Sequence, residues 1–185
     1  MEALLVSLGV VALAEMGDKT QLLALLLAAR LRAPAAVLCG ILTATLANHL
    51  LAAALGTALA AHLAPAVRRW LLGACFLLGA LWMLRPERAP AAQPRAAGLG
   101  AYGASVVSFF LLEMGDKTQF ATVALAARYQ ALAPVVAGST LGMLLADAPL
   151  VLLGEAAARR LPLGVLRSLA ALLCLALAGA ALLRP

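Results

Sequence analysis

Glu15-Met16-Gly17-Asp18-Lys19-Thr20-Gln21 is a charged heptapeptide inside an apolar run, and Glu113-Met114-Gly115-Asp116-Lys117-Thr118-Gln119 repeats it 98 residues later. The likeness extends further, because residues 15–30 and 113–128 match at 11 of 16 positions. Each Asp or Lys at the centre of a membrane helix costs about 2.5–3.5 kcal/mol on insertion scales. Two such costly groups at equivalent places predict the two halves of one intramembrane ion site.

The composition around the motifs is that of a membrane protein. Only 12% of the 185 residues are charged, whereas about a quarter are charged in soluble domains. The mean hydropathy is +1.02, and apolar runs of the roughly 20 residues that cross a bilayer recur along the whole length. We therefore expect an all-α integral membrane protein that has the lipid bilayer as its surroundings and no separate soluble domain.

The net charge of +6 does not indicate a nucleic-acid partner. All twelve arginines lie at or near the ends of apolar runs, where positive charge sets membrane orientation. Both lysines and four of the eight acidic residues lie inside the two motifs. The three cysteines, Cys39, Cys75 and Cys174, have no metal-type spacing, and we expect them to be small buried apolar residues.

The apolar runs predict six membrane spans, at about residues 3–28, 35–60, 70–84, 99–127, 135–154 and 163–183. Residues 85–98 contain three prolines and three arginines, and proline, which lacks a backbone donor, favours a loop there. The sequence thus predicts a first three-span repeat over residues 1–84, a linker over residues 85–98 and a second repeat over residues 99–185.

Because three is an odd number, equivalent segments of the two repeats would cross the membrane in opposite directions. Gly40 and Gly138, and Gly56 and Gly154, keep the 98-residue offset, so the likeness continues through the second span of each repeat. Many secondary transporters are built from such inverted repeats and place their site near the midplane. The predicted fold is six transmembrane helices arranged as two inverted three-helix repeats.

Arginine counts predict the orientation of these spans. One side would hold Arg30, Arg32, Arg85, Arg88, Arg95, Arg159, Arg160 and Arg167. The other side would hold Arg68, Arg69, Arg128 and Arg184. We expect the richer side, which includes the linker, to face the cytoplasm, and both termini to lie outside it.

On a continuous helix, with 100° between residues, Glu15, Asp18 and Lys19 would share one stripe. The second motif would present Glu113, Asp116 and Lys117 in the same way. The glycine inside each motif has two interpretations: it lets another backbone approach closely, or it permits a local break in the helix. The sequence leaves both open.

If the two motif helices cross here, four carboxylates meet, those of Glu15, Asp18, Glu113 and Asp116. Oxygen ligands suit calcium, magnesium and manganese, and no thiol or paired histidine accompanies the motifs to favour zinc or copper. Four acids against two lysines leave a formal charge of −2, which one divalent cation or two protons would neutralise. The pattern therefore predicts that metal ions and protons compete for one site.

Other polar residues are predicted to assist. Thr20, Gln21, Thr118 and Gln119 lie within a turn of the acids. Lys19 and Lys117 either hold the carboxylates and replace the cation in the empty site, or form helix-local ion pairs with the glutamate four residues earlier. The sequence does not distinguish these two roles.

The second span of each repeat also carries polar groups. By the 98-residue offset Asp147 corresponds to His49, and Asn48 to Ala146. Pro149 cannot donate to the carbonyl of Leu145, which leaves that oxygen free near Asp147. We expect Asp147 to be an accessory ligand or a proton carrier, Asn48 to be an accessory residue, and His49 to serve packing.

The doubled motif resembles that of the Gdt-type exchangers, the calcium/cation antiporter-2 family that includes transmembrane protein 165. The first Glu-x-Gly-Asp-Lys-Thr motif is matched by Glu15, Gly17, Asp18, Lys19 and Thr20, and the second by Glu113, Gly115, Asp116, Lys117 and Thr118. The resemblance implies exchange of Mn²⁺ and Ca²⁺ for protons, and a bacterial plasma-membrane member. The family's long central loop is here a short linker rich in arginine and proline.

We therefore expect a secondary transporter, not an enzyme, that exports Mn²⁺ and accepts Ca²⁺, with the metal as substrate and no cofactor. The sequence ranks neither metal first and leaves the oligomeric state open, with a homodimer among the options. One alternative is an intramembrane aspartyl hydrolase, which the lysine beside each aspartate disfavours. Another is a non-transporting scaffold, in which Glu15–Lys19 and Glu113–Lys117 are buried pairs that fix helix packing.

Overall fold

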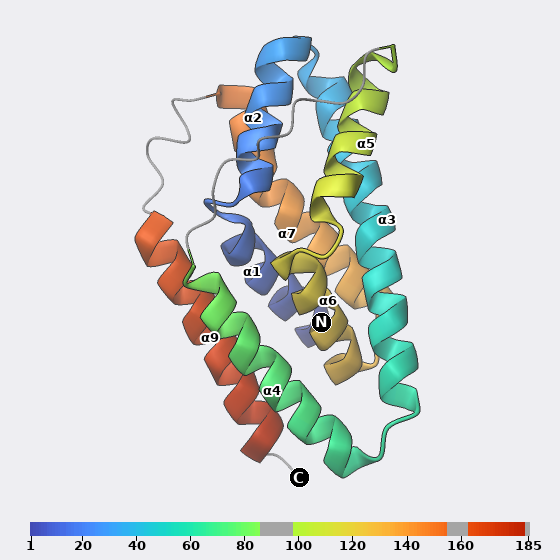
Figure 1. The fold of residues 1–185 in the computed structure, drawn as a ribbon, viewed down its shortest axis with the longest axis vertical. Coiled ribbons are helices and arrows are strands. Elements are labelled where there is room, and N and C mark those ends of the chain that lie inside the picture. The colour runs from blue at the N-terminus through green and yellow to red at the C-terminus, as the bar shows by residue number, and fades with distance from the viewer. Residues whose placement is uncertain (86–97, 155–162, 184–185) are drawn as a thin grey trace.

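The computed structural model describes residues 1–85, 98–154 and 163–183, and this part of the chain contains eight helices and no strand (Figure 1). The helices are α1 (Glu2–Glu15), α2 (Lys19–Leu31), α3 (Pro34–Ala61), α4 (Pro65–Met83), α5 (Gly100–Glu113), α6 (Lys117–Tyr129), α7 (Leu132–Leu153) and α9 (Leu163–Leu183). The predicted all-α class is confirmed. The predicted linker falls almost entirely on residues 86–97, outside the described residues.

Four of the described helices, α3, α4, α7 and α9, are long and apolar enough to cross a membrane. Helix α3 shows what such a helix presents to its surroundings. Its outward leucines, which are 40–57% exposed, are Leu42, Leu46, Leu50, Leu51, Leu55 and Leu59. A stripe of this size is too apolar for water but suits lipid, so the chain is a multi-pass membrane protein.

Three of the predicted spans form single helices close to their expected bounds. Residues 35–60 lie within α3, residues 135–154 correspond to α7, and residues 163–183 are α9. The third predicted span is extended, because α4 begins at Pro65. Proline suits the first position of a helix, where its missing N–H would have no partner and its φ is already helical.

The first and fourth predicted spans are each broken into two helices at the motif. Gly17 has φ +83° and Gly115 has φ +79°, a region that residues with a Cβ rarely adopt. The methionine before each glycine and the aspartate after it are extended, with nearly equal angles in the two copies. The continuous-helix stripe predicted for the charged residues is therefore wrong, and the glycines act as helix breaks.

The broken spans pack against the other half of the chain. In Figure 1, α2 and α6 leave the middle of the molecule toward opposite ends. Helices α1 and α2 of the first half both pack on α7 of the second half. In the same way, α5 and α6 of the second half both pack on α3 of the first half. A Cβ at Gly40 would collide with the carbonyl of Tyr102, and one at Gly138 with the carbonyl of Leu4. These contacts correspond to each other by the 98-residue offset, so each half packs on the other in the same way.

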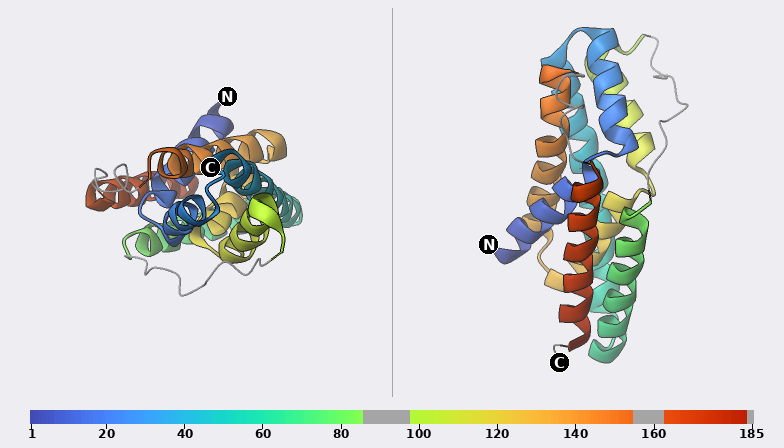
Figure 2. Two further views of the ribbon diagram at one scale, coloured as in Figure 1. Left: turned by 90° about the horizontal axis from the view of Figure 1, so that it is seen from above. Right: turned by 90° about the vertical axis from the view of Figure 1, so that its left-hand side faces the viewer.

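Helices α4 and α9 depart from this reciprocal packing. They lie side by side in both views of Figure 2, and α4 packs against α6 while α9 packs against α1. Their apolar contacts form a core cluster that includes Leu72, Phe76, Ala170 and Cys174. The pair therefore covers the half of the molecule that holds α1 and α6.

Candidate functional site

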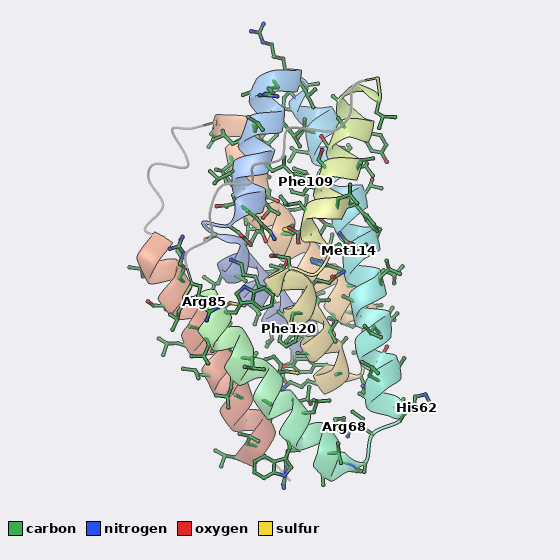
Figure 3. The ribbon with its side chains drawn as sticks, viewed as in Figure 1. His62, Arg68, Arg85, Phe109, Met114 and Phe120 are labelled. Atoms are coloured by element: carbon green, nitrogen blue, oxygen red, sulfur yellow. The ribbon has the colours of Figure 1, made fainter. Side chains whose placement is uncertain are left out.

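The two helix breaks bring the motifs to the middle of the molecule. Figure 3 shows Met114, at the break between α5 and α6, between Phe109 on one side and Phe120 on the other. All four motif acids are at most 2% exposed, namely Glu15, Asp18, Glu113 and Asp116. The carboxylates are thus removed from bulk solvent, and each needs a compensating charge or donor.

Two ion pairs cross between the motifs. Lys19 Nζ lies 2.7 Å from Asp116 Oδ1, and Lys117 Nζ lies 3.1 Å from Asp18 Oδ2. Each lysine therefore pairs with the aspartate of the other motif, and the two motifs meet. The lysine of each motif begins one helix while its glutamate ends another, so these pairs link the halves of the chain rather than stabilising one helix turn.

The two glutamines and Asp18 hold the breaks in shape. Gly17 N–H donates to Gln21 Oε1 at 2.8 Å, and Gly115 N–H donates to Gln119 Oε1 at 2.7 Å. Asp18 caps α2 by accepting the Lys19 N–H at 2.6 Å, as acidic residues at helix starts commonly do, whereas the side chain of Asp116 makes no such capping hydrogen bond. The glutamines, predicted as accessory, and Asp18, predicted as a metal ligand, thus act on the backbone of the motifs.

Helix α7 meets the first motif through its backbone. Gln21 Nε2 donates to the carbonyl oxygen of Ala146 at 2.9 Å. The sequence pointed to the carbonyl of Leu145, freed by Pro149, and the hydrogen bond that forms is one residue further along. Gln21 thus ties the first break to the turn of α7 that carries Asp147.

The two glutamates occupy a different environment from the aspartates. Each is the last residue of its helix, where the backbone dipole presents its negative pole. Both Glu15 carboxylate oxygens are buried without a hydrogen-bond donor among the described residues, and so is Glu113 Oε1. Such oxygens are costly unless a proton or a cation reaches them.

The two halves differ at the threonines. Thr118 Oγ1 donates to Glu113 Oε2 at 2.9 Å, whereas the equivalent hydroxyl of Thr20 is buried without a partner in the described part of the chain. Glu113 therefore has one satisfied oxygen, and Glu15 has none within those residues. Of the two glutamates, Glu15 has the greater need of a proton or a cation.

Asp147 and Asn48 lie close to the motifs, as expected. Asp147 is fully buried on α7, neither of its oxygens has a donor among the described residues, and it interacts electrostatically with Glu15 and Glu113. Asn48 Nδ2 donates to the carbonyl of Phe110 at 3.1 Å, while its Oδ1 is buried and unpartnered in the same set. Asp147 therefore adds oxygen atoms beside the glutamates, and Asn48 contacts α5 three residues before Glu113.

His49 is enclosed beside this layer. The ring is 1% exposed and its Nδ1 lies 3.5 Å from Thr140 Oγ1 of α7, at the limit of a hydrogen bond. This position is consistent with the packing role that the sequence predicted.

The site fits a hard cation by the chemistry of its donors. The buried oxygens that lack donors within the described residues belong to carboxylates, an amide and a hydroxyl, which are the ligands that manganese, calcium and magnesium accept. In this arrangement no three His, Cys, Asp or Glu side chains of the described residues are placed to hold one ion. Instead, each aspartate forms an ion pair with a lysine.

A cavity of about 280 Å³ between α3, α4 and α6 reaches the second motif. Gly115, Asp116 and Gln119 form its inner wall, together with apolar residues of α3. The rings of Trp82 and Phe120 flank it with their centroids 6.3 Å apart. Asp116 thus connects the buried ion pairs with a space large enough for several water molecules.

Arg167 contacts the first motif but is not among the site residues predicted from the sequence. Arg167 Nη2 donates to the carbonyl of Gly17 at 3.4 Å, a long hydrogen bond from α9 to the first break. The arginine count used Arg167 only to set the orientation of the spans, and Arg167 lies inside α9, as the predicted last span implied. The available signal was its position within the last apolar run, where it corresponds to Arg69 by the 98-residue offset.

If the crossed ion pairs stabilise the fold, the stability lost in a lysine variant should be restored when its partner aspartate is also replaced. The Lys117→Met variant removes the ion pair between Lys117 and the buried Asp18, so we expect a loss of about 3–5 kcal/mol in unfolding free energy. The double variant Lys117→Met/Asp18→Asn should recover most of it, because asparagine removes the charge and still caps α2. Lys19→Met should cost less, since the Lys19 side chain is 23% exposed. Unfolding of the purified protein tests this, and equal losses in the single and double variants would contradict it.

Comparison with known proteins identifies the family of the chain. The model of the family "Divalent cation/proton antiporter GDT1" matches residues 3–91 and 101–185. A protein of Vibrio cholerae serotype O1 described as "Putative manganese exporter" is 48% identical over 179 residues, which cover 96% of this chain and 89% of that relative. No solved structure matches the chain. The resemblance carried by the two motifs is confirmed, and the chain belongs to the divalent cation/proton antiporter GDT1 family.

Proposed function

We propose that the protein is a secondary transporter that exports Mn²⁺ from the cytoplasm in exchange for protons, and that it also accepts Ca²⁺. The observation that carries this proposal is the pair of buried glutamates, Glu15 and Glu113. Three of their four carboxylate oxygens lack donors within the described residues, while the neighbouring aspartates are paired with lysines. Membership of a family of divalent cation transporters supports it. The metal is then a substrate, and the protein is not an enzyme.

The distribution of charge assigns different roles to the acids. The Lys19–Asp116 and Lys117–Asp18 pairs are each neutral, so the motifs' formal charge of −2 remains on the two glutamates, and Asp147 is a further buried carboxylate beside them. The aspartates lie at the positive ends of α2 and α6, whereas the glutamates lie at the negative ends of α1 and α5, where cations are stabilised. The glutamates are therefore the exchanging groups, and the aspartates hold the two motifs together.

The neighbouring oxygens determine which metals suit the site. Asp147, Asn48 and Thr20 contribute buried oxygens without donors among the described residues, and these can complete the coordination of an ion held by the glutamates. Sulfur does not take part, because Cys39 is exposed and Cys174 packs in the α4–α9 cluster. Oxygen-only ligation favours Mn²⁺ and Ca²⁺ over Zn²⁺ and Cu²⁺.

Alternating access requires the site to face each side of the membrane in turn. In the proposed arrangement α1–α2 and α5–α6 are two broken spans, and the chain forms two inverted three-span repeats in the plasma membrane with both termini outside the cytoplasm. The reciprocal packing of α1 on α7 and α5 on α3 supports it. Rocking of one half against the other would expose the glutamates to either side, and the cavity at Asp116 is a candidate part of one path.

The inverted arrangement predicts that the ends of α2 and α6 lie on opposite membrane faces. Arg32 and Gln130 are equivalent exposed residues that end these helices. In a background with all three cysteines replaced by serine, Arg32→Cys should react with an impermeant maleimide only from the cytoplasmic side, and Gln130→Cys only from the other. Labelling of intact cells and inverted vesicles measures this, and reaction of both from one side would rule out the inverted repeats.

Transport itself is tested in vesicles that contain the purified protein. An imposed proton gradient should drive Mn²⁺ movement, and Glu15→Gln or Glu113→Gln should lower its initial rate at least about tenfold, the factor that corresponds to about 1.4 kcal/mol. Glu87→Gln, in the linker sequence, is the matched control and should transport normally.

Two results would contradict the proposal. Movement of Mn²⁺ that ignores the proton gradient would indicate a channel. Unchanged transport in both glutamate variants would show that the buried acids serve packing alone, as in the scaffold alternative.

A further inference from the structure

A second cavity, of about 580 Å³, lies at the end of the molecule where α4 begins and α6 and α9 end. Figure 3 places Arg68 and His62 at this end, away from Met114 in the middle. Three arginines line the cavity, Arg68 and Arg69 from the first turns of α4 and Arg128 from the last turn of α6. This cavity is separate from the motif site and has a different charge.

The charge of the cavity excludes a path for cations. Among the described residues that line it, three arginines face a single acid, Glu2, so the formal charge of this part of the lining is +2. Glu2 is also engaged, because its Oε1 accepts a hydrogen bond from Tyr129 at 3.1 Å. A divalent cation would be repelled here, whereas an anion would be attracted.

The arginines are held in place and retain unused donors. Arg128 Nη1 donates to the carbonyl of Leu177 on α9 at 3.0 Å, and its guanidinium lies 5.4 Å from the centre of the Tyr129 ring. Arg69 stacks on Trp70 at 5.8 Å, and its Nε is buried without a hydrogen-bond partner in the described part of the chain. A buried unpaired donor is costly, and a phosphate oxygen is the acceptor that a guanidinium group fits best.

The surroundings of the cavity favour a phosphate that carries acyl chains. Leu72, Ala180 and Ala181 give the cavity an apolar wall, and the adjacent face of α4 exposes Val67, Trp70 and Leu71 by 48–63%. Tryptophan beside arginine at the end of a span is typical of the level of the lipid headgroups. A molecule with an anionic head and apolar chains satisfies both parts of this surface.

We propose that this cavity binds the phosphate headgroup of an anionic phospholipid, with the acyl chains lying along α4 and α9. Basic pockets between membrane helices bind such headgroups. Because α4 packs on α6 and α9 packs on α1, a lipid bound by Arg68, Arg69 and Arg128 would join α4 to α6 beside the end of α9. The proposal does not depend on which ion the motif site transports.

The test measures lipid retained by the full-length protein after purification in mild detergent. Phosphatidylglycerol should be retained and should raise the melting temperature in nanodiscs, whereas phosphatidylcholine should do neither. Arg69→Gln should lower phosphatidylglycerol affinity about fivefold, the factor for about 1 kcal/mol per basic residue, and Arg68→Gln/Arg69→Gln should lower it about 25-fold. Arg30→Gln, an exposed arginine at the end of α2, is the control and should bind normally.

Three results would overturn the proposal. The first is equal stabilisation by phosphatidylcholine and phosphatidylglycerol. The second is full stabilisation by inorganic phosphate in phosphatidylcholine nanodiscs, which would assign the cavity to a soluble anion. The third is unchanged affinity in the arginine variants. Arg69→Lys, which keeps the charge but loses the guanidinium donors, should have an affinity between those of wild type and Arg69→Gln, and this order shows that a loss is not misfolding.

Discussion

Two lysine–aspartate pairs cross between the motifs, and the character of the whole site depends on them. Without Lys19 on Asp116 and Lys117 on Asp18, two buried aspartates would repel each other and the glutamates nearby. With the pairs formed, the motifs are joined and the aspartates are neutralised. The remaining negative charge of the motifs lies on the two glutamates, and in the proposed function one divalent cation or two protons neutralise it.

The helix breaks explain why the chain uses glutamate at one end of each motif and aspartate at the other. Gly17 and Gly115 adopt positive φ, so one helix ends and another begins within three residues. The short aspartate side chain suits the N-cap, where it reaches the first N–H groups. The glutamate carboxylate is left at the negative pole of the preceding helix, where a cation is stabilised. In the proposed function the motif thus separates a structural acid from an exchangeable one.

Much of this organisation could be predicted from the sequence. The repeated motif predicted two equivalent segments that meet in the structure, apolar runs located α3, α7 and α9, and the arrangement of hydrophobic residues identified a membrane protein. The break could not be decided, because a motif glycine suits both close packing and positive φ. The partner of Lys19 is 97 residues away, and only the three-dimensional packing of the halves selects it over the nearby Glu15. The difference between Thr20 and Thr118 is likewise invisible in two identical heptapeptides.

The central claim is that the two glutamates carry the protons that Mn²⁺ displaces, and proton release on metal binding tests it most directly. In weakly buffered detergent solution near neutral pH, saturating Mn²⁺ should release about two protons per ion from the wild-type protein, because the metal replaces protons on its ligands. Under the same conditions Glu15→Gln should release about one. Metal binding without proton release, or the same release from wild type and Glu15→Gln, would contradict the account.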